Sequence, residues 1–584
     1  MTNIPSSSPQ KNKVEGVKLS SHYLRGNLRH DLEQPGDAFS DDDSLLLKFH
    51  GIYQQDDRDV RKARKALGLG AEHSFMIRVA IPGGALSKDQ YLELDALSDR
   101  LANGGLRITT RQAIQYHGVL KGGLKPLLQT LEAHRLTSLS ACGDVVRNIV
   151  ACPAPLVSRS RTEIGRYAML LSNALKPRAR AYVEIWLDGE KAATIEEPIL
   201  EEPMLEQPVF EPNGSLETEE PLYGATYLPR KFKIAFAYPG DNCVDAYTQD
   251  VGIVPVMNGD SLEAFTLIVG GGLGQSHTVK DTHPRLGDPM TTIAPDKLLA
   301  VVTAIVKVQR DFGRRDDRKY SRMKYLVEAM GIEAFRDQVS QYLGYALGAA
   351  QSLEWLSGDD HLGWTEQGDG KLFLGLFIEN GRIKDQARAG LREVIARFVP
   401  EVRLTPQQNI LLCQIEPSDK PAINDLLEQY SIALPETIGA AIVQSMACPA
   451  FPTCGLAITE AERALPALIR QVQTMLETHG LSDALSAPVI RMTGCPNGCA
   501  RPYSAEVGLV GRGINSYALY LGGSHLGLRL ARVYADNLQF DQIVPQLEAI
   551  LERFKAERRG LERFGDYCDR TLFPISGVPI SSAS

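Results

Sequence analysis

The feature of this 584-residue chain that most restricts its fold is an internal repeat. Three pairs of segments match at a nearly constant separation: FMIRVAIPGGAL (75–86) with LFLGLFIENGRI (372–383), LRITTRQAI (106–114) with VRLTPQQNI (402–410), and LSAC (139–142) with SMAC (445–448). The separations are 297, 296 and 306 residues. This regularity indicates two copies of one long unit.

Each copy has the pattern of an α+β unit. Residues 88–101 and 385–398 have the apolar spacing of a helix, and each is followed by a β-branched run that is typical of a strand. Short strands with one helix between them predict ferredoxin-like half-domains. Two copies in one chain predict a pseudo-twofold molecule with a ligand site between its halves.

Composition excludes some classes of function. The net charge is -8 and the pI is near 5.9, so no overall basic field draws the chain to nucleic acid or to an anionic membrane. The N-terminal MTNIPSSSPQKNK lacks the apolar stretch of a secretory signal. No uncharged apolar run reaches the roughly 18 residues that a membrane span needs. We therefore expect a cytoplasmic protein that binds neither nucleic acid nor membrane.

Two stretches are expected to lie outside the repeated units. Residues 1–40 are rich in Ser, Pro, Asn and Asp and are interpreted as a mobile arm. Residues 201–223 contain seven Glu, four Pro and no Lys or Arg. This composition predicts a solvated surface insertion without regular structure.

Four of the nine cysteines form two close pairs, C-x5-C in MACPAFPTC (446–454) and C-x3-C in TGCPNGC (493–499). An odd number of cysteines in a long chain argues against a disulfide framework. Four thiolates on loops that contain Gly and Pro are typical of an iron–sulfur cluster. A structural zinc site prefers C-x2–4-C pairs and fits less well, and inert buried thiols are the other alternative. The other five cysteines are interpreted as such thiols: Cys142, Cys152, Cys243, Cys413 and Cys568.

CPAFPTC followed by TGCPNGC resembles the sirohaem and [4Fe–4S] motif of the sulfite/nitrite reductase family, which is also built from two copies. Other segments resemble the haemoprotein (beta) subunits of its NADPH-dependent assimilatory branch: SSHYLRG (20–26), FHGIYQQDDRD (49–59), RAYVEIWLDGEK (180–191), TYLPRKFK (226–233) and FGDY (564–567). The resemblance covers nearly the whole chain except the arm and the insertion.

The resemblance implies the six-electron reduction of sulfite to sulfide, in sulfur assimilation and cysteine biosynthesis. It assigns the four paired cysteines to the cluster, the last of them also to the sirohaem iron as a bridging ligand, and an asparagine to the cofactor site: Cys448, Cys454, Cys495, Cys499 and Asn497. The alternatives are a ferredoxin-dependent sulfite or nitrite reductase and, from another class, a non-catalytic Fe–S electron carrier or a zinc-stabilised scaffold.

No nucleotide-binding unit is recognisable in the chain. GGGLGQSH (270–277) is rich in glycine but lacks the G-x-G-x-x-G spacing of a dinucleotide loop. NADPH oxidation is therefore expected on a partner, and the resemblance implies a flavoprotein (alpha) subunit in a hetero-oligomer. The N-terminal arm is a candidate docking element for that partner.

Basic residues are expected to hold the carboxylates of sirohaem, because arginine donates two parallel hydrogen bonds to a carboxylate. In RITTRQAIQYH (107–117), four polar side chains would share one face of a regular strand: Arg107, Arg111, Gln115 and His117. From the pattern alone an exposed polar strand face is the alternative. The resemblance places these residues at the periphery of the sirohaem.

A second basic set is expected to bind the anionic substrate. The resemblance assigns this role to Arg78, Arg147, Lys231 and Lys233. The two lysines would share one strand face while Phe232 points into the core. Arg78 lies in an apolar strand, where a buried ion pair is the alternative to a ligand site.

The repeat predicts a division of labour between the copies. Arg78 corresponds to Gly375 and Arg111 to Gln407, so the first copy has the basic residues. The second copy has the paired cysteines, for which the first copy has no evident match near Arg147.

These observations divide the chain into an arm and lead-in, two ferredoxin-like (parachute) half-domains and two sirohaem/[4Fe–4S]-binding α/β domains. The expected ranges, in chain order, are 1–65 for the arm and lead-in, 66–132 and 133–360 for copy one, and 361–432 and 433–584 for copy two.

Overall fold

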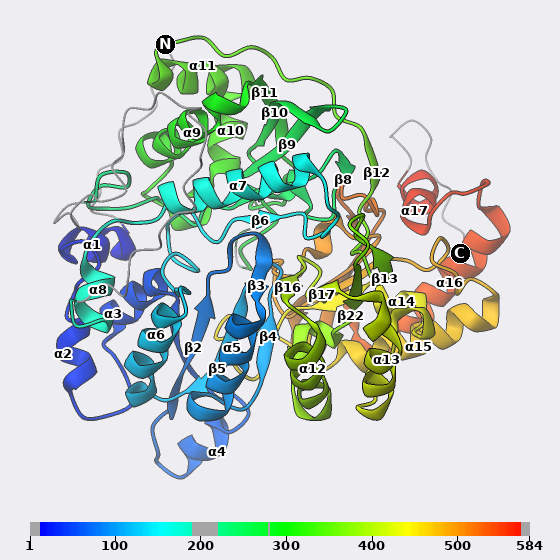
Figure 1. Ribbon diagram of the computed structural model, residues 1–584, viewed down its shortest axis with the longest axis horizontal. Coiled ribbons are helices and arrows are strands. Elements are labelled where there is room, and N and C mark those ends of the chain that lie inside the picture. Colours follow the sequence, from blue (N-terminus) through cyan, green and yellow to red (C-terminus); the bar gives the residue numbers. More distant parts are fainter. Residues whose placement is uncertain (1–11, 190–219, 278, 280, 574–584) are drawn as a thin grey trace.

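In the computed structural model the described residues are 12–189, 220–277, 279 and 281–573. This part of the chain forms four five-stranded sheets and one two-stranded pair (Figure 1). The sheets fall into two matching sets, one for each copy of the repeat. The pseudo-twofold α+β fold predicted from the sequence is confirmed.

The two half-domains have the same order of elements. In copy one these are β2 (His73–Val79), α5 (Lys88–Leu101), β4 (Leu106–Ile108), β5 (Ile114–Val119) and α6 (Leu124–Ala133). In copy two they are β14 (Leu372–Leu376), α12 (Asp385–Phe398), β16 (Glu401–Leu404), β17 (Ile410–Ile415) and α13 (Lys420–Gln429). An edge strand precedes each set, β1 (Ile52–Asp56) or β13 (Gly363–Glu366).

The half-domains exchange one short strand. β15 (Arg382–Ile383) of copy two pairs with β4, and β3 (Ala85–Ser87) of copy one pairs with β16. A glycine precedes each exchanged strand in the left-handed region, Gly84 at φ 76° and Gly381 at φ 72°. A side chain there would meet the carbonyl oxygen of Leu404 or Ile108 in the other copy. Each sheet is therefore completed by the other copy.

The two α/β domains also match strand for strand. The copy-one sheet contains β6 (Val150–Ala151), β7 (Ile234–Phe236), β9 (Val251–Asn258), β10 (Ser261–Val269) and β11 (Asp288–Ile293). The copy-two sheet contains β18 (Ser445–Ala447), β19 (Ile490–Thr493), β20 (Val507–Gly513), β21 (Ser516–Leu521) and β22 (Arg532–Gln539). In each sheet the first three strands are parallel and the last two are added antiparallel.

The strand register corrects the third pair of repeat segments. Ala151 pairs with Phe236 in one sheet, and Ala447 pairs with Met492 in the other. Ala447–Cys448 therefore corresponds to Ala151–Cys152, at the same separation of 296 residues as the second pair. Pairing LSAC (139–142) with SMAC (445–448) was wrong, because LSAC lies in a loop that precedes β6.

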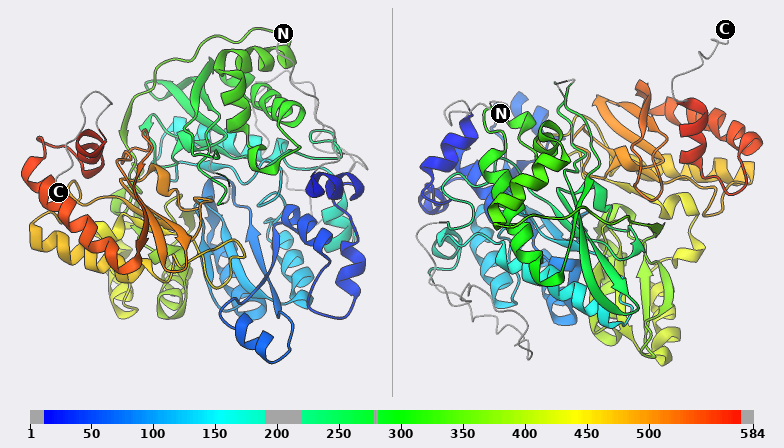
Figure 2. Two further views of the ribbon diagram at one scale, coloured as in Figure 1. Left: turned by 180° about the vertical axis from the view of Figure 1, so that it is seen from behind. Right: turned by 90° about the horizontal axis from the view of Figure 1, so that it is seen from above.

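Helices cover the two α/β sheets (Figures 1 and 2). α7 (Arg159–Ala174), α9 (Leu298–Phe312) and α11 (Ile332–Leu343) pack on the copy-one side. α15 (Leu465–His479), α16 (Ile543–Glu557) and α17 (Phe564–Leu572) pack on the copy-two side. The remaining elements are short: α1 (Lys13–Ser20), α2 (Leu28–Glu33), α3 (Asp41–Leu46), α4 (Arg61–Ala66), α8 (Ala181–Trp186), α10 (Met323–Met330), α14 (Ala440–Val443), β8 (Gly240–Asp241) and β12 (Trp355–Ser357).

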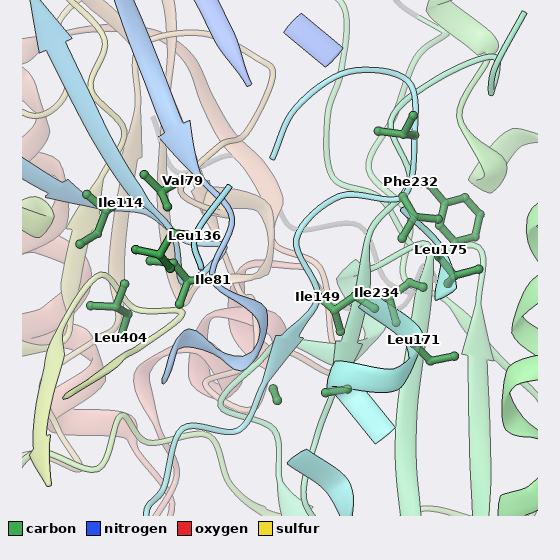
Figure 3. Close-up of a cluster of buried hydrophobic side chains, with 14 of the residues drawn as sticks. Val79, Ile81, Ile114, Leu136, Ile149, Leu171, Leu175, Phe232, Ile234 and Leu404 are labelled. Carbon is green, nitrogen blue, oxygen red and sulfur yellow. The ribbon is translucent and has the colours of Figure 1, made fainter. Parts of the chain in front are cut away.

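One hydrophobic core joins both half-domains to the copy-one sheet, while the copy-two sheet has a core of its own. In Figure 3, Val79, Ile114 and Leu404 lie at one end of the shared core, and Phe232 and Ile234 lie at the other. Burying a side chain of this kind contributes about 1.5–3 kcal/mol. The shared core therefore fixes the strands that carry the basic residues relative to one another.

The N-terminal arm is not mobile from residue 12 onward, because α1 packs against the body of the protein. The buried Lys18 donates from Nζ to Leu228 O at 2.9 Å and pairs with Glu15 and with Asp144. Asp144 lies three residues before Arg147, so α1 supports the loop that carries that arginine. Residues 1–11 lie outside the described part.

The acidic insertion is described only at its C-terminal end, since residues 201–219 lie outside the described part. Glu220 and Tyr223 are buried rather than solvated. The Glu220 carboxylate accepts hydrogen bonds from the backbone N–H groups of Arg178 and Ala179, at 2.7 and 3.1 Å. The insertion thus rejoins the fold through a buried anchor. Among the described residues, no helix combines the length and the apolar character needed to cross a bilayer.

Candidate functional site

The four paired cysteines lie on two loops that follow neighbouring parallel strands. Cys448 directly follows β18, and Cys495 and Cys499 follow β19. The backbone N–H of Gly494 donates to Cys448 Sγ at 3.4 Å, and Asn497 Nδ2 donates to Cys495 Sγ at 3.5 Å. Because the carboxyl ends of parallel strands meet at one edge of a sheet, the fold brings together cysteines that are far apart in sequence.

The thiol groups form one electrostatic unit. Burial, with Cys499 and Cys454 acting in the same direction, raises the pKa of Cys495 to about 12. Burial and the other three thiols likewise raise the pKa of Cys448 well above its ordinary value. Thiols whose pKa is raised by burial and by neighbouring thiols need a cation nearby to become thiolates. The donor set therefore fits an iron–sulfur cluster, held by these four residues and by N–H donors to sulfur.

Arg58, from the segment that precedes the first half-domain, clamps the loop of Cys454. Its Nη1 donates to Cys454 O at 3.0 Å and to Ala457 O at 2.7 Å, and its guanidinium lies 4.4 Å from the centre of the Phe451 ring. Sequence reasoning missed this residue, because its partners lie about 400 positions away in the chain.

Arg58→Ala should loosen this loop and make the cluster labile. Hydrogen bonds from a charged donor contribute about 1.5–3 kcal/mol each, so removing two should speed iron loss to a chelator by about tenfold or more. The measurement is iron and labile sulfide per chain against time. Arg463→Ala, which removes the exposed pair with Asp59 close by, is the control and should change the rate little. Equal rates of iron loss from the Arg58→Ala and Arg463→Ala proteins would contradict the role of Arg58.

The glycine-rich segment 270–277 packs against the loop of Cys495 and Cys499. Gln275 N donates to Pro496 O at 2.9 Å, and a Cβ at Gly274 would lie 3.2 Å from Asn497 O. The glycines of this segment allow close backbone approach to the cysteine loop. The segment thus has a structural role at the site.

A row of polar side chains crosses the first half-domain sheet next to the cysteine loops. The strand register places Arg78 opposite Gln115, Gln115 opposite Arg107, and Arg107 opposite Arg382. Directly opposed residues share a face of the sheet, so these four side chains line one face. The matching row of copy two is Gly375, Leu411, Arg403 and Ala85. The basic row lies on the copy-one sheet, to which copy two adds Arg382.

Residues 107–117 are not one regular strand. β4 ends at Ile108, residues 109–113 form a turn, and β5 begins at Ile114. Arg107, Gln115 and His117 still share a face, because β4 and β5 pair. Arg111 lies in the turn and donates instead to Gln249 Oε1 at 2.7 Å and to Ile234 O at 2.9 Å.

Arg107 and His117 differ in whether their side-chain nitrogens already have hydrogen-bond partners. Arg107 is buried and already engaged, with Glu462 at 3.0 Å and with Ala447 O at 3.0 Å, directly before Cys448. His117 is also buried, and both of its ring nitrogens lack a partner among the described residues. Burial, followed by the charges of Arg382, Arg107 and Arg78, lowers its pKa well below the ordinary value. A neutral, unpartnered imidazole beside three arginines fits a cofactor that carries carboxylates.

The lysines lie where the copy-one sheet meets the row. Phe232 is buried, and Lys231 and Lys233 point to the opposite side and are partly exposed. This alternation was predicted, although β7 itself begins only at Ile234. The Arg147 backbone N–H donates to Phe232 O at 2.9 Å, and its guanidinium holds Gly143 O. No hydrogen bond or ion pair to a described residue engages either lysine ammonium group.

Charge couples these residues to one another and to the cysteines. Burial, followed by Lys233, Arg322, Arg147 and Arg230, lowers the pKa of Lys231 well below its ordinary value. Burial, with Arg111 and Arg322, lowers the pKa of Lys233 to about 7, whereas the Cys499 thiol acts in the opposite direction. Cys499 also contributes to the raised pKa of Arg78, in which burial is the largest, opposing effect. The structure thus brings Lys233 and Arg78 within electrostatic reach of Cys499.

Two buried basic residues near the lysines were missed from the sequence. Arg322 pairs with the fully buried Asp250 at 3.0 Å, and Asp250 accepts from the Lys233 backbone N–H at 2.9 Å. Lys324 donates to the carbonyl oxygens of Gly272 and Gly274. Arg322 could have been found only from its buried pair with Asp250. A single sequence does not show which charged residues are buried.

Comparison with known proteins places this geometry in a family. The Nitrite/Sulfite reductase ferredoxin-like half domain matches residues 70–134 and 365–430, and the Nitrite and sulphite reductase 4Fe-4S domain matches residues 167–347. The latter match covers copy one, while the four paired cysteines lie in copy two.

Similar proteins align over nearly the full length. A "Sulfite reductase [ferredoxin]" of Synechococcus elongatus is 44% identical, covering 97% of this chain and 91% of that protein. A "Sulfite reductase [NADPH] hemoprotein beta-component" of Staphylococcus carnosus is 42% identical over 95% of each. The solved structure of the Mycobacterium tuberculosis NirA protein matches with a TM-score of 0.76 at 23% identity, covering 96% of each chain, and shows the same fold.

Proposed function

Because this chain belongs to the nitrite and sulfite reductase family, we propose that it reduces sulfite to sulfide at a sirohaem coupled to a [4Fe–4S] cluster. The observation that carries the proposal is the pair Lys231 and Lys233, whose ammonium groups have no hydrogen bond or ion pair to a described residue, with Lys233 within electrostatic reach of Cys499. An electron carrier or a zinc scaffold has no use for such an anion site. The proposed setting is sulfur assimilation and cysteine biosynthesis.

We propose that Cys448, Cys454, Cys495 and Cys499 would hold the cluster and that Cys499 would also be a ligand of the sirohaem iron. The bound cofactors supply the six electrons that convert SO3²⁻ and six protons to S²⁻ and three waters. Asn497 supports the cluster through Cys495 Sγ. The sirohaem carboxylates are assigned to Arg111, Gln115, His117 and the already paired Arg107.

The substrate is assigned to Arg78, Arg147, Lys231 and Lys233. Fixed cations stabilise an anion as negative charge accumulates, without reorganisation of solvent. Lys233, with a pKa of about 7, can be charged when the anion binds and can give up a proton near neutral pH. Lys231 is set among four other cations, and burial together with their charges lowers its pKa well below the ordinary value.

Spectra and turnover test this function. The purified protein should show sirohaem absorption, with iron and labile sulfide in the ratio of one haem to one [4Fe–4S] cluster. It should reduce sulfite with an artificial one-electron donor. A protein with the cluster but without sirohaem, or with neither, would overturn the proposal.

We propose NADPH as the source of electrons, through a flavoprotein partner, in line with the beta-component name carried by relatives of 40–42% identity. A second candidate donor is ferredoxin, because the relative of 44% identity is named for it. Sulfite turnover with NADPH plus a purified flavoprotein subunit, compared with turnover with reduced ferredoxin, distinguishes the two. Parallel assays with nitrite determine the substrate preference.

The Lys233 ammonium predicts a pH dependence. It loses its charge as the pH rises through about 7, so kcat/KM for an anionic substrate should fall over this range. Lys233→Arg stays charged, and its profile should remain flat there. Nitrite is the better substrate for this test, because sulfite itself titrates near neutrality. The groups that act on Lys233 include Arg111, Arg322, Asp250, Cys499 and the neighbouring Lys231, and all of them are unchanged in the variant. Identical profiles for both proteins would exclude Lys233 as the titrating group.

A further inference from the structure

A second group of metal-ligating side chains lies outside the site described above. Cys152, Asp241, Cys243 and His361 each bring one ligand atom within 4.8 Å of all the others. Cys152 Sγ lies 3.2 Å from Asp241 Oδ2 and 3.7 Å from His361 Nε2, and the latter two atoms are 3.1 Å apart. We propose that these four side chains bind one tetrahedral Zn²⁺ ion.

The pseudo-twofold relation makes this group the counterpart of the cluster site. Cys152 follows β6 as Cys448 follows β18. The register of β7 and β9 against that of β19 and β20 places Cys243 at the position of Cys499. In both copies the turn of the opposite half-domain reaches the carbonyl oxygen of this cysteine: Gln407 Nε2 donates to Cys243 O at 3.4 Å, and Thr110 Oγ1 donates to Cys499 O at 3.2 Å.

Copy one thus has cysteines at two of the four thiol positions and other residues elsewhere in the corresponding loops. Pro239 stands where copy two has Cys495, and Asp241 stands where it has Asn497. Two thiolates do not complete the ligand set of an iron–sulfur cluster. A carboxylate and an imidazole complete a four-ligand set of the kind that zinc accepts.

The spacing of the ligand atoms agrees with one tetrahedral ion. Zinc lies about 2.3 Å from sulfur and about 2.0–2.1 Å from nitrogen or oxygen, which places neighbouring ligand atoms roughly 3.3–3.8 Å apart. The three separations between Cys152, Asp241 and His361, from 3.1 to 3.7 Å, are close to this range. Small movements of side chains would complete the geometry.

The surroundings orient the ligands. Asp241 Oδ1 accepts from the Cys243 backbone N–H at 2.9 Å, which leaves Oδ2 facing the other ligands. Arg161, stacked 3.7 Å from the centre of the Tyr238 ring, donates from Nη1 to Cys152 Sγ at 3.4 Å. Its charge offsets the single negative charge that two thiolates and one carboxylate leave on a divalent ion. The two cysteines of the group pack in a small apolar cluster with Val150, Ala235, Ala237, Val244, Ala246, Val254 and Ile268. Such supporting contacts are what a built metal site requires.

The position of His361 indicates what the ion does. This residue lies between β12 and β13, on the segment that leads from the α/β domain of copy one to the half-domain of copy two. Its neighbour Asp360 accepts hydrogen bonds from Thr405 and Asn409 in that half-domain. Zinc at this point would fasten the connection between the copies to the edge of the copy-one sheet, which is a structural role.

Metal analysis of the full-length holoprotein, purified with Zn²⁺ in the growth medium, tests this inference. We expect about one zinc per chain in addition to iron, with two sulfur and two lighter ligands in the zinc-edge X-ray absorption spectrum. Cys152→Ser and His361→Gln should each lower the zinc content by more than about tenfold, since even supporting residues of metal sites cost 10–100-fold. His361 is partly exposed, so its variant tests the site with little risk to folding.

Cys413→Ser is the matched control, because this buried thiol on β17 is not one of the four ligating side chains, so the variant should keep its zinc. The inference is overturned if the wild-type protein contains no zinc, if both ligand variants retain it, or if fresh protein contains a Cys152–Cys243 disulfide. Iron and sirohaem are measured on the same samples. Loss of zinc alone therefore remains distinguishable from a failure of the proposed redox function.

Discussion

Cys499→Ser should abolish both the coupled cluster–haem spectrum and sulfite turnover. Cys499 is the exposed member of the four paired cysteines, and it is the one whose charge reaches Arg78 and Lys233. A bridging residue must face both cofactors, whereas Cys448 and Cys495 are buried within the loops. Since a residue that only supports a metal ligand contributes about 10–100-fold, loss of the bridge should cost more than that.

The measurement combines optical and electron paramagnetic resonance spectra with turnover on the same preparation. Cys568→Ser is the control, because this thiol is buried on α17 and should tolerate the change without loss of either signal. A Cys499→Ser protein with normal coupled spectra and normal turnover would disprove the bridging assignment. If the cluster were lost and sirohaem retained, Cys499 would be a cluster ligand without a bridging role.

The repeat and the cysteine spacing were sufficient to predict the fold and the convergence of the thiols. The cysteine pairs and the helix and strand patterns each depend on residues within one segment, and the repeat is found by comparing such segments directly. The exchange of β3 and β15 was not visible, because strands of two or three residues leave almost no pattern. Sequence spacing also could not show that Arg107 and Gln115 meet across a hairpin rather than along one strand.

The counterpart relation of Cys152 and Cys243 was hidden for a different reason. The segment between β6 and β7 is longer than that between β18 and β19, so the separation of the copies changes from 296 residues at Cys152 to 256 at Cys243. A search at constant separation therefore misses the second cysteine. Only the hydrogen-bonded register of parallel strands restores the correspondence. Arg58 shows the same limit, because its contacts exist only once the two copies have assembled.

Lys231→Ala should reduce sulfite turnover by about 10²–10³-fold, the effect expected when a fixed group that stabilises developing charge is removed. Lys231 lies among Lys233, Arg322, Arg147 and Arg230, and these like charges, together with burial, lower its pKa. Such an arrangement is costly in the free protein and becomes favourable only when an anion enters. Removing the lysine should therefore relieve repulsion, so that the free energy of unfolding stays equal or rises while turnover falls.

A substrate ligand is distinguished from a structural residue by this result, in which turnover falls while the free energy of unfolding stays equal or rises. The measurements are the sirohaem content, the unfolding midpoint and kcat/KM for sulfite, with Lys62→Ala on the exposed face of α4 as the control. Lys231→Arg should recover part of the activity, because it restores the charge with a bulkier group. If the sirohaem content and the midpoint fell together with turnover, Lys231 would be holding the fold or the cofactor, and the anion site would have to be assigned to Arg78, Arg147 and Lys233 alone.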